Sequence, residues 1–470
     1  MTNPVAARRS GVRRGLAACY LADVSAVSAF VRLRSLVSSA ATAARFFRGA
    51  VWNGLAVLAV RGLAMAGLVV VARVCGPELF GLVSGPNQAG GLVGTAIGYG
   101  TATASTKTVS EIVRTSTPTT ATDGRSPEVE QSVRRCHEIG VQTGVGLTVA
   151  GLVLAVAAFA AGWSGIAVPI AFSGPIAGLT VLQLTQLGLY ASLDRFRSQA
   201  GFGFVGSVIG VAVLLAICPS RSAPWLLAGV VALLLVQSIA LARGLGQTLR
   251  PFAGRSAIPP DASFRQTARP ATQVATVGVV AQLAGLLVLW VTASQTEFGL
   301  FMAANQSFVL LMFVPATLAT VLYPILVERR PAAIPVGFAA VVAAAAVPVM
   351  LAWSLRSTIV TVYGSEYVGL TEPLSWTLAT VLLAAVLRPT YLALAARESL
   401  AKTPWLAAAS GLVLVTLAWH WRADGASGLA AARFASFATH AIAAVALLVA
   451  TPAMPATSQG RPKTQLEVAA

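Results

Sequence analysis

Long apolar runs separated by short polar segments dominate the pattern of this chain. Each run has about 20 residues or more, the length an α-helix needs to cross a hydrocarbon core of about 30 Å. The runs do not alternate apolar and polar positions over ~10 residues, as transmembrane strands do. The pattern predicts an all-α integral membrane protein with twelve spans, near 52–72, 80–106, 138–162, 166–191, 200–218, 224–242, 271–293, 298–327, 334–354, 373–395, 403–421 and 427–450.

Composition excludes a soluble protein. Of the 470 residues, 56% are apolar and 10% are charged, whereas an ordinary soluble chain carries about 25% charged residues. So few charges cannot cover a water-exposed surface of this size.

The distribution of Lys and Arg predicts the orientation. With the N-terminus in the cytoplasm, 26 of the 33 Lys and Arg residues fall on the cytoplasmic side, four fall outside and three lie within spans. This is the positive-inside pattern. It predicts a multi-pass protein of the cell (inner) membrane with both termini in the cytoplasm. The net charge of +17 then reflects topology and contact with anionic membrane lipids, not a nucleic-acid partner.

One short motif occurs twice. Residues 80–88 read FGLVSGPNQ and residues 298–306 read FGLFMAANQ, with five of nine positions identical. Both copies begin a span that enters from the outer side. The repeat predicts two six-helix bundles of the same orientation, an arrangement in which transporters bind substrate between the halves. The alternative is a chance recurrence of Phe-Gly-Leu.

The repeat and the polar segments divide the chain. We expect a cytoplasmic Arg-rich segment, an N-terminal bundle, a Pro-, Gly- and Arg-rich cytoplasmic linker, a C-terminal bundle and a cytoplasmic tail, at 1–51, 52–243, 244–270, 271–450 and 451–470.

The sequence contains no signature of an enzyme or a cofactor site. No Gly-rich loop ends in GK[ST], which argues against nucleotide hydrolysis. His137, His420 and His440 are scattered, and the four cysteines have no metal-ligand spacing. Only Cys75 and Cys218 lie near the predicted outer face; two unpaired thiols are expected there, with a disulfide as the alternative. We therefore expect a non-enzyme without metal or cofactor.

Charges inside the spans are the most informative side chains. Arg61 lies about 14 Å past Trp52 along the first helix, where an arginine is costly unless it faces water or a partner. Arg61 is therefore a candidate for substrate binding; the alternative is a bond to a backbone carbonyl or an amide of a neighbouring helix. Arg388 is a further candidate for the substrate cavity; it lies nearer the cytoplasmic end, and the alternative is that its side chain snorkels to the membrane surface. Arg433 lies near the outer boundary and is expected to be an anchor.

Neutral amides supply the other candidates for a substrate cavity. Gln183 and Gln186 share one face of their helix with Tyr190. Amides can bind sugar hydroxyls in a hydrated lumen, or they can bridge helices at about 0.6 kcal/mol each. The remaining amide candidates are Asn53, Gln88, Gln282, Asn305 and Gln306.

No Asp or Glu falls in the middle of any predicted span. A cation-coupled antiporter is expected to hold an intramembrane carboxylate for its coupling ion. The absence favours an anionic substrate over a cationic drug.

Several segments resemble the polysaccharide biosynthesis flippases of the multidrug/oligosaccharidyl-lipid/polysaccharide exporter superfamily. These are ARVCGPELFGL, LYASLDRFR, FGLFMAANQSFVLLMFVPATLATVLYPILVE and YGSEYVGLTEPLSW, in that order along the chain. The resemblance covers roughly residues 50–450. The long Arg-rich N-terminus and the extended 107–137 loop depart from the family pattern.

The resemblance implies two bundles that move a polyprenyl-diphosphate-linked oligosaccharide across the membrane by alternating access, for cell-surface polysaccharide biosynthesis. In such a flippase the planar guanidinium of Arg61 would suit the diphosphate of the substrate. Its partners would be the lipid-linked substrate, membrane lipids, and a glycan polymerase or glycosyltransferases of the same pathway. A cation-coupled multidrug antiporter of the same superfamily is the alternative function.

Overall fold

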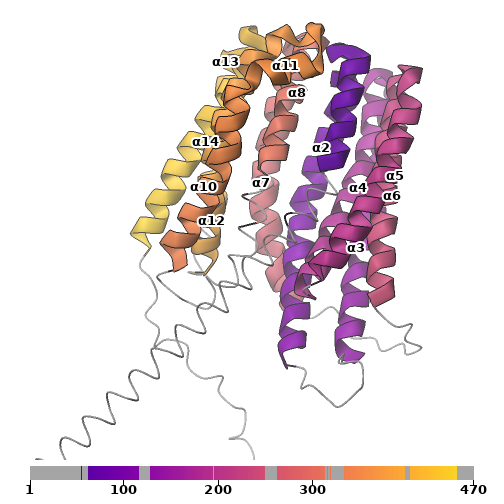
Figure 1. Cartoon of the computed structure of the whole chain (residues 1–470), viewed down its shortest axis with the longest axis vertical. Helices are drawn as coiled ribbons and strands as arrows, with labels where there is room; N and C mark the ends of the chain where they lie inside the picture. Colours follow the sequence, from indigo (N-terminus) through magenta and orange to yellow (C-terminus); the bar gives the residue numbers. More distant parts are fainter. Residues whose placement is uncertain are drawn as a thin grey trace, which may run out of the picture. The chain divides into compact units, whose positions relative to one another are not determined.

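The computed structural model describes residue 54 and residues 62–115, 127–193, 195–248, 262–312, 315, 318, 333–396 and 403–451. Within these residues the protein is helical and contains no strand (Figure 1). The α-helices are α2 (Leu63–Thr115), α3 (Pro127–Ala160), α4 (Ser164–Ser192), α5 (Phe196–Ile217), α6 (Ala223–Thr248), α7 (Ala262–Thr292), α8 (Gln295–Leu311), α10 (Ala333–Ser354), α11 (Arg356–Tyr363), α12 (Thr371–Ala396), α13 (Thr403–His420) and α14 (Gly425–Ala450).

The α2 helix consists of two segments that meet at Gly76. This glycine has φ 75° and ψ 170°, a left-handed φ that other residues adopt only at a cost. Gly67 packs against Val211 and Cys75 lies beside Cys218, so the segment 63–75 runs in the same direction as α5.

The segment after Gly76 runs the other way. Gly90 packs against Ile176, and Gly98 packs against Leu184, so residues 77–115 are parallel to α4. Because α4 and α5 are antiparallel neighbours along the chain, the two segments of α2 form a helical hairpin. The turn between predicted spans 52–72 and 80–106 therefore lies at Gly76, and we call this end of the molecule the Gly76 end.

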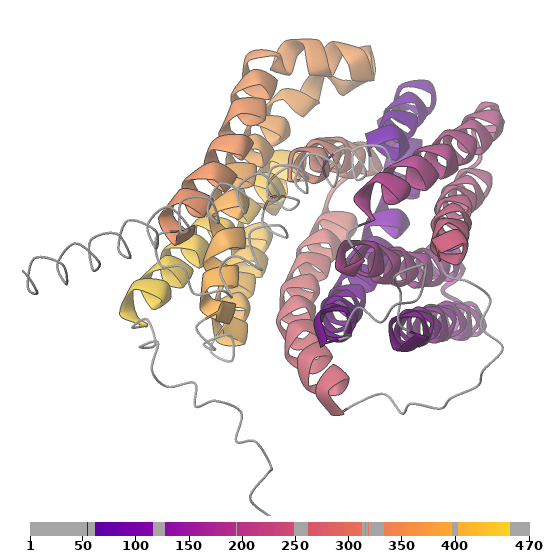
Figure 2. The same ribbon diagram turned by 60° about the horizontal axis from the view of Figure 1, so that its bottom comes forward.

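The helices pack in the two groups that the repeat predicts. In the N-terminal bundle, α4 packs on α2, α3 and α6, and α5 packs on α6. In the C-terminal bundle, α12 contacts α10 and α14, and α13 contacts α7 and α14. The bundles meet where the second segment of α2 packs against α7 and α8 (Figure 2). Each of the twelve predicted spans overlaps one described helical segment, which confirms the all-α two-bundle fold.

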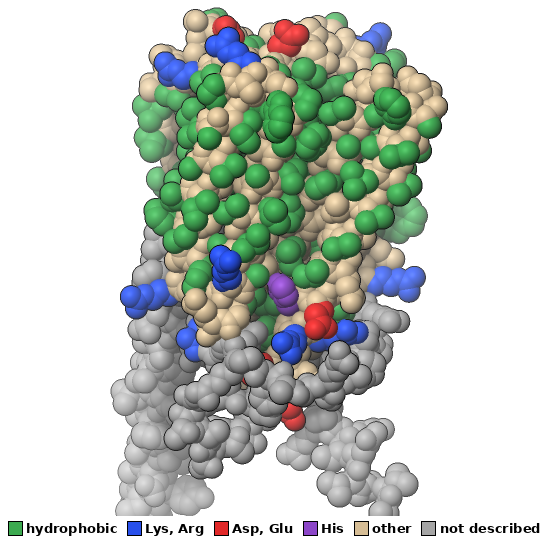
Figure 3. Space-filling model, turned by 90° about the vertical axis from the view of Figure 1, so that its right-hand side faces the viewer, with side chains coloured by type: hydrophobic (Ala, Val, Ile, Leu, Met, Phe, Trp, Pro, Cys, Tyr) green, Lys and Arg blue, Asp and Glu red, His purple; other side chains and the backbone are tan. Residues whose placement is uncertain are grey.

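Length and composition agree with a membrane location. Nine described helices are long and apolar enough to cross a bilayer, with α2 taken as one, and α10 with α11 is a tenth candidate bent by 68°. On the face in Figure 3, charged side chains gather at the two ends and hydrophobic side chains fill the band between them. The α3 helix exposes large apolar side chains such as Val153, Val156 and Phe159, which is unfavourable in water but favourable in lipid.

Several helices extend beyond their predicted spans into polar segments. The second α2 segment continues to Thr115 and α3 begins at Pro127, so both enter the predicted 107–137 loop. The predicted linker 244–270 is likewise helical at both ends, since α6 ends at Thr248 and α7 begins at Ala262. The domain boundaries themselves stay predictions, and residues 1–51 lie outside the described residues.

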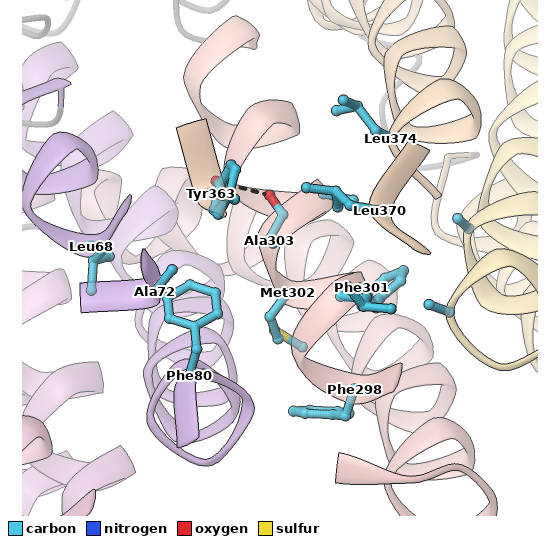
Figure 4. Packing of buried hydrophobic residues seen from close by; sticks show 14 of the residues in the cluster. Leu68, Ala72, Phe80, Phe298, Phe301, Met302, Ala303, Tyr363, Leu370 and Leu374 are labelled. Atoms are coloured by element: carbon cyan, nitrogen blue, oxygen red, sulfur yellow. Dashed lines mark hydrogen bonds between the residues drawn. The ribbon is translucent and has the colours of Figure 1, made fainter. Parts of the chain in front are cut away.

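The largest buried cluster lies where the bundles meet at the Gly76 end (Figure 4). Phe80 and Phe298, the first residues of the two repeated motifs, are 0% and 3% exposed. Tyr363 Oη donates to the Ala303 carbonyl at 3.3 Å within the C-terminal bundle. Tyr367 Oη donates to the Ala72 carbonyl at 3.1 Å and so joins the two bundles.

The glycines of the two repeated motifs lie at a close contact between the bundles. A Cβ atom on Gly81 would lie 3.0 Å from the backbone nitrogen of Gly299, and one on Gly299 would lie 1.8 Å from the Pro77 carbonyl oxygen. Only glycine permits this approach of the two backbones. The two copies of the motif therefore pack directly against each other across the bundle interface.

Candidate substrate-binding site

A charged side chain lies buried in the C-terminal bundle. Arg433 lies eight residues into α14, about 12 Å along the helix, and is 6% exposed. Its Nη1 donates to Asn305 Oδ1 on α8 at 2.5 Å, and its Cζ lies 4.0 Å from the ring centre of Phe308. The anchor role expected from sequence is wrong, because the guanidinium points into the protein and not toward the membrane surface.

The start of α8 and the start of α14 are tied together, which sets this pairing. Ser294 caps α8, since its side chain accepts a hydrogen bond from the Glu297 amide. The Glu297 carboxylate in turn accepts a bond from the Ala426 amide at 2.9 Å in the first turn of α14. Asn305 and Arg433 lie eight and seven residues further along, so roughly two turns bring both to the same depth.

Arg433 has no acidic partner among the residues that the structure describes. Its Nε is buried and makes no hydrogen bond there. An arginine stays protonated in proteins, and a buried charge without a counter-charge is strongly unfavourable. Nη1 bonds to a neutral amide and the Phe308 ring contributes a cation–π contact. Neither cancels the charge, so the site favours an anion.

A small cavity of about 20 Å³ lies beside this arginine, room for about one water molecule. Its walls come from both bundles, with α2 on one side and α7, α8, α13 and α14 on the other. Polar groups and apolar side chains share the lining, which comprises Gln88, Gln282, Leu286, Phe301, Asn305, Leu414, Leu429 and Arg433.

The structure brings together three of the predicted cavity residues. Gln88, Gln282 and Asn305 all line the cavity with Arg433. Gln306, next to Asn305, is 9% exposed and is not in the lining. Arg388 is exposed on α12, as the snorkelling alternative requires. Arg61 and Asn53 lie outside the described residues, so their roles stay predictions.

The two glutamines of α4 lie elsewhere, inside the N-terminal bundle. Gln183 Nε2 donates to the Leu234 carbonyl at 3.1 Å and to Gln237 Oε1 at 3.2 Å. Gln186 Nε2 donates to the Ser238 carbonyl at 3.1 Å. These bonds join α4 to α6, which is the helix-bridging alternative of the sequence interpretation. A part in substrate binding stays a prediction for both residues.

A second polar cluster, missed in the sequence, lies among α12, α13 and α14. The His440 Nε2 is hydrogen-bonded to the Tyr391 hydroxyl, and its Nδ1 is 3.1 Å from Ser410 Oγ. The Tyr391 and His440 rings pack edge to face, with their ring centres 5.5 Å apart. His440 is seven residues from Arg433 on the same face of α14, a spacing that hinted at a shared polar stripe.

The described residues hold no group of three or more His, Cys, Asp or Glu side chains placed to bind a metal ion. The polar groups of the cavity are amides and one guanidinium, which recognise anionic or hydroxyl-bearing groups through hydrogen bonds.

Comparison with solved structures identifies the fold. No protein-family model and no curated protein matches the sequence. The chain is similar to a MOP superfamily transporter from Pyrococcus furiosus whose binding pocket is described as having reverse polarity, with TM-score 0.65, 13% identity, and 87% of this chain and 94% of that chain covered.

The chain is also similar to two conformations of a multidrug resistance MATE family transporter of the MOP superfamily. The outward-facing one has TM-score 0.63, 13% identity, and covers 87% of this chain and 96% of that chain. The inward-facing one has TM-score 0.56, 13% identity, and covers 85% and 98%. From these matches and the two-bundle architecture, we conclude that this chain has the fold of the MOP superfamily transporters.

Proposed function

We propose that the protein is an exporter that moves a polyprenyl-diphosphate-linked oligosaccharide across the cell membrane by alternating access. The observation that carries this proposal is Arg433, a buried cation without an acidic partner among the described residues, in a cavity lined from both bundles. Such a site suits a substrate that brings its own negative charge. A cationic drug would be repelled from it.

The remaining polar lining fits a substrate with a glycan. Gln88 on α2 and Gln282 on α7 face the same small space as Asn305, and amides can both donate to and accept from sugar hydroxyls. The cavity of about 20 Å³ is far too small for a sugar. In the proposed cycle the bundles separate, the site widens, and the diphosphate reaches Arg433 while the polyprenyl tail stays in the lipid.

The cycle requires the bundles to move as units. Two hydrogen bonds join the described segments 63–75 and 356–370 across the bundle interface. Tyr367 Oη donates to the Ala72 carbonyl, and Arg73 Nη1 donates to the Val362 carbonyl at 3.0 Å. Hydrogen bonds within each bundle are more numerous. We place the Gly76 end outside and both termini in the cytoplasm, on the charge distribution of the loops. Glycosyltransferases or a glycan polymerase of the same pathway are the proposed partners.

The second candidate function is a cation-coupled multidrug antiporter. It is favoured by the similarity of the fold to MATE family transporters. Against it stands the absence of any Asp or Glu from the middle of a predicted span. An antiporter of this chain would need a coupling group other than a mid-span carboxylate.

The test is to delete the gene in the native host, supply radioactive sugar, and extract the polyprenyl-linked glycans. Accumulation of a completed lipid-linked oligosaccharide, with loss of the exported polymer, is the expected result. An unchanged lipid pool together with loss of dye efflux would instead support the antiporter.

Complementation with variants then tests the site. Arg433→Gln, expressed at the wild-type level, should leave the lipid-linked pool elevated, whereas Arg433→Lys should relieve it in part because the charge is kept. The matched control is Arg388→Gln, which removes an exposed arginine of the same bundle and should restore export. Full complementation by Arg433→Gln would exclude this residue from the site.

A further inference from the structure

Two cysteines far apart in sequence lie side by side at the Gly76 end. Cys75 is the last residue of the first α2 segment, directly before the Gly76 turn. Cys218 directly follows α5. Their sulfur atoms are 4.0 Å apart, although 143 residues separate them in the chain. Both are reduced in this structure.

We propose that Cys75 and Cys218 form a disulfide bond in the mature protein. The two thiols are unpaired in the structure, as the sequence predicts, but their proximity makes the alternative, a disulfide, attainable. A bridge needs a sulfur–sulfur distance of about 2.0 Å, which side-chain rotation and a small approach of the helix ends can supply. Cys218 is 3% exposed and Cys75 is half-buried, so an oxidant reaches the pair through Cys75.

The reaction is an ordinary thiol–disulfide exchange. The thiolate of Cys75 attacks a disulfide of the donor, which is an oxidoreductase or a small-molecule disulfide on the outer side of the membrane. Cys218 then attacks the mixed disulfide, a bond forms between the two protein sulfurs, and the donor leaves as two thiols. The protein loses two electrons and two protons, which the donor gains.

The location decides whether such a bond persists. Disulfides are stable in oxidising compartments outside the cytoplasm and are rare inside it. The proposal therefore rests on the orientation that places the Gly76 end outside. Cys136 provides the contrast, since it lies in α3 near the opposite end, is buried, and has no cysteine within bonding distance among the described residues.

The bond would hold one of the N-terminal-bundle segments that contact the C-terminal bundle, the first α2 segment. In this segment, three residues before Cys75, the Ala72 carbonyl accepts the hydrogen bond from Tyr367 Oη. Arg73, two residues before Cys75, donates to the Val362 carbonyl. The bridge would fix this segment to α5, within one bundle. It would leave the bundles free to move against each other, so oxidation should not block transport.

The test begins with intact cells that express the full-length chain. The cells are treated with N-ethylmaleimide before lysis, and the purified protein is digested without reductant and analysed by mass spectrometry. The expected product is one pair of peptides joined through Cys75 and Cys218. Recovery of both cysteines as separate alkylated peptides would overturn the proposal.

Matched variants separate this bond from general thiol reactivity. Cys136→Ser should keep the joined peptides, and Cys75→Ser should abolish them and leave Cys218 alkylated. A reducing agent should lower the Tm of the purified wild-type protein by roughly 5 °C, because the bridge closes a long loop. The Tm of Cys75→Ser should not respond to the reductant. A wild-type Tm that is equally insensitive would also count against the bond.

Discussion

Gly81 and Gly299, the equivalent glycines of the two repeated motifs, lie against each other at the interface of the bundles. A Cβ atom on Gly81 would be 3.2 Å from the Gly299 Cα atom. Each glycine follows a buried phenylalanine, Phe80 or Phe298. The same two residues therefore have the same role in both motifs: an aromatic side chain fills the interface, and the glycine that follows lets the backbones approach.

Substitution of Gly299 by alanine should disrupt this contact. The added methyl would lie 1.8 Å from the Pro77 carbonyl oxygen, a rigid backbone atom, so α2 and α8 must separate. Overpacking of this kind costs about 1–3 kcal/mol. We expect a Tm several degrees below that of the wild type, measured on purified protein in detergent, and reduced export in complemented cells.

Gly91→Ala is the matched control, since a Cβ there would meet no heavy atom within 4 Å. In a helix interior this change should be neutral or stabilise the protein by about 0.5–1 kcal/mol. Equal effects of the two substitutions would show that helix propensity, not the contact of the repeats, governs the result.

The helices and the repeat that form this interface are predictable from the sequence, whereas the buried position of Arg433 is not. Hydrophobic length gives spans, and the repeat gives their pairing, because both are properties of local sequence. The sequence predicts an anchor role for Arg433, because position in a span gives the depth of a residue but not the direction of its side chain. Its burial follows from the tie between Glu297 and the start of α14, a contact 129 residues apart that no local pattern reveals.

The amide side chains show the same limit: the sequence predicts which residues share a helix face but not what that face contacts. The helical period predicts that Gln183 and Gln186 share one face of their helix, and both side chains do bond to the same neighbouring helix, α6. That face meets α6 and not the bundle interface. Gln282 and Asn305, which share no such face with each other, converge on the cavity from different helices.

Asn305→Asp should separate charge balance from transport. The change keeps the size of the side chain. It replaces the amide oxygen of Asn305, which lies 2.5 Å from Arg433 Nη1, by a carboxylate oxygen. The buried guanidinium then gains the acidic partner that it lacks, and the strong charge-assisted bond should raise the Tm by a few degrees. An anionic substrate would have to compete with that carboxylate, so export should fall at least about tenfold, an effect of roughly 1.4 kcal/mol.

The control is Asn87→Asp, the equivalent position of the first motif, which lies outside the cavity lining. It should not raise the Tm. Wild-type export by Asn305→Asp, assayed as clearance of the lipid-linked pool, would exclude an anionic group of the substrate from this site.

The Tyr391–His440 pair should be coupled in stability. Tyr391→Phe removes the hydroxyl that bonds to His440 Nε2, and a ring nitrogen left without a partner costs about 1–3 kcal/mol. His440→Phe removes both ring nitrogens and frees Ser410 Oγ as well. In a double-mutant cycle the two changes should be less than additive, with a coupling of about 0.5–3 kcal/mol.

Thr439→Ala provides the reference for that cycle, because Thr439 is exposed and bonds only to its own helix at Ala435. Its effect should be small and should add to that of Tyr391→Phe. Strict additivity between Tyr391→Phe and His440→Phe would mean that the two side chains contribute independently.

Gln186→Leu should change the Tm and not export, and Gln282→Leu should change export and not the Tm. This difference distinguishes a glutamine that bridges helices from one that lines the cavity. Gln186 is 0% exposed, and its bond to the Ser238 carbonyl joins α4 to α6. Interhelical bonds in membranes contribute about 0.6 kcal/mol, so Gln186→Leu should lower the Tm slightly and leave export intact.

Gln282 lines the cavity with Arg433 and is only half-buried, so the leucine variant should keep its Tm. Its export should fall, because an apolar side chain then faces the sugar hydroxyls in the proposed complex. Both quantities can be measured on one set of strains, with Tm from the purified variants and export from the radiolabelled lipid pool. Loss of export by Gln186→Leu at an unchanged Tm would return that residue to the substrate path and extend the path into the N-terminal bundle.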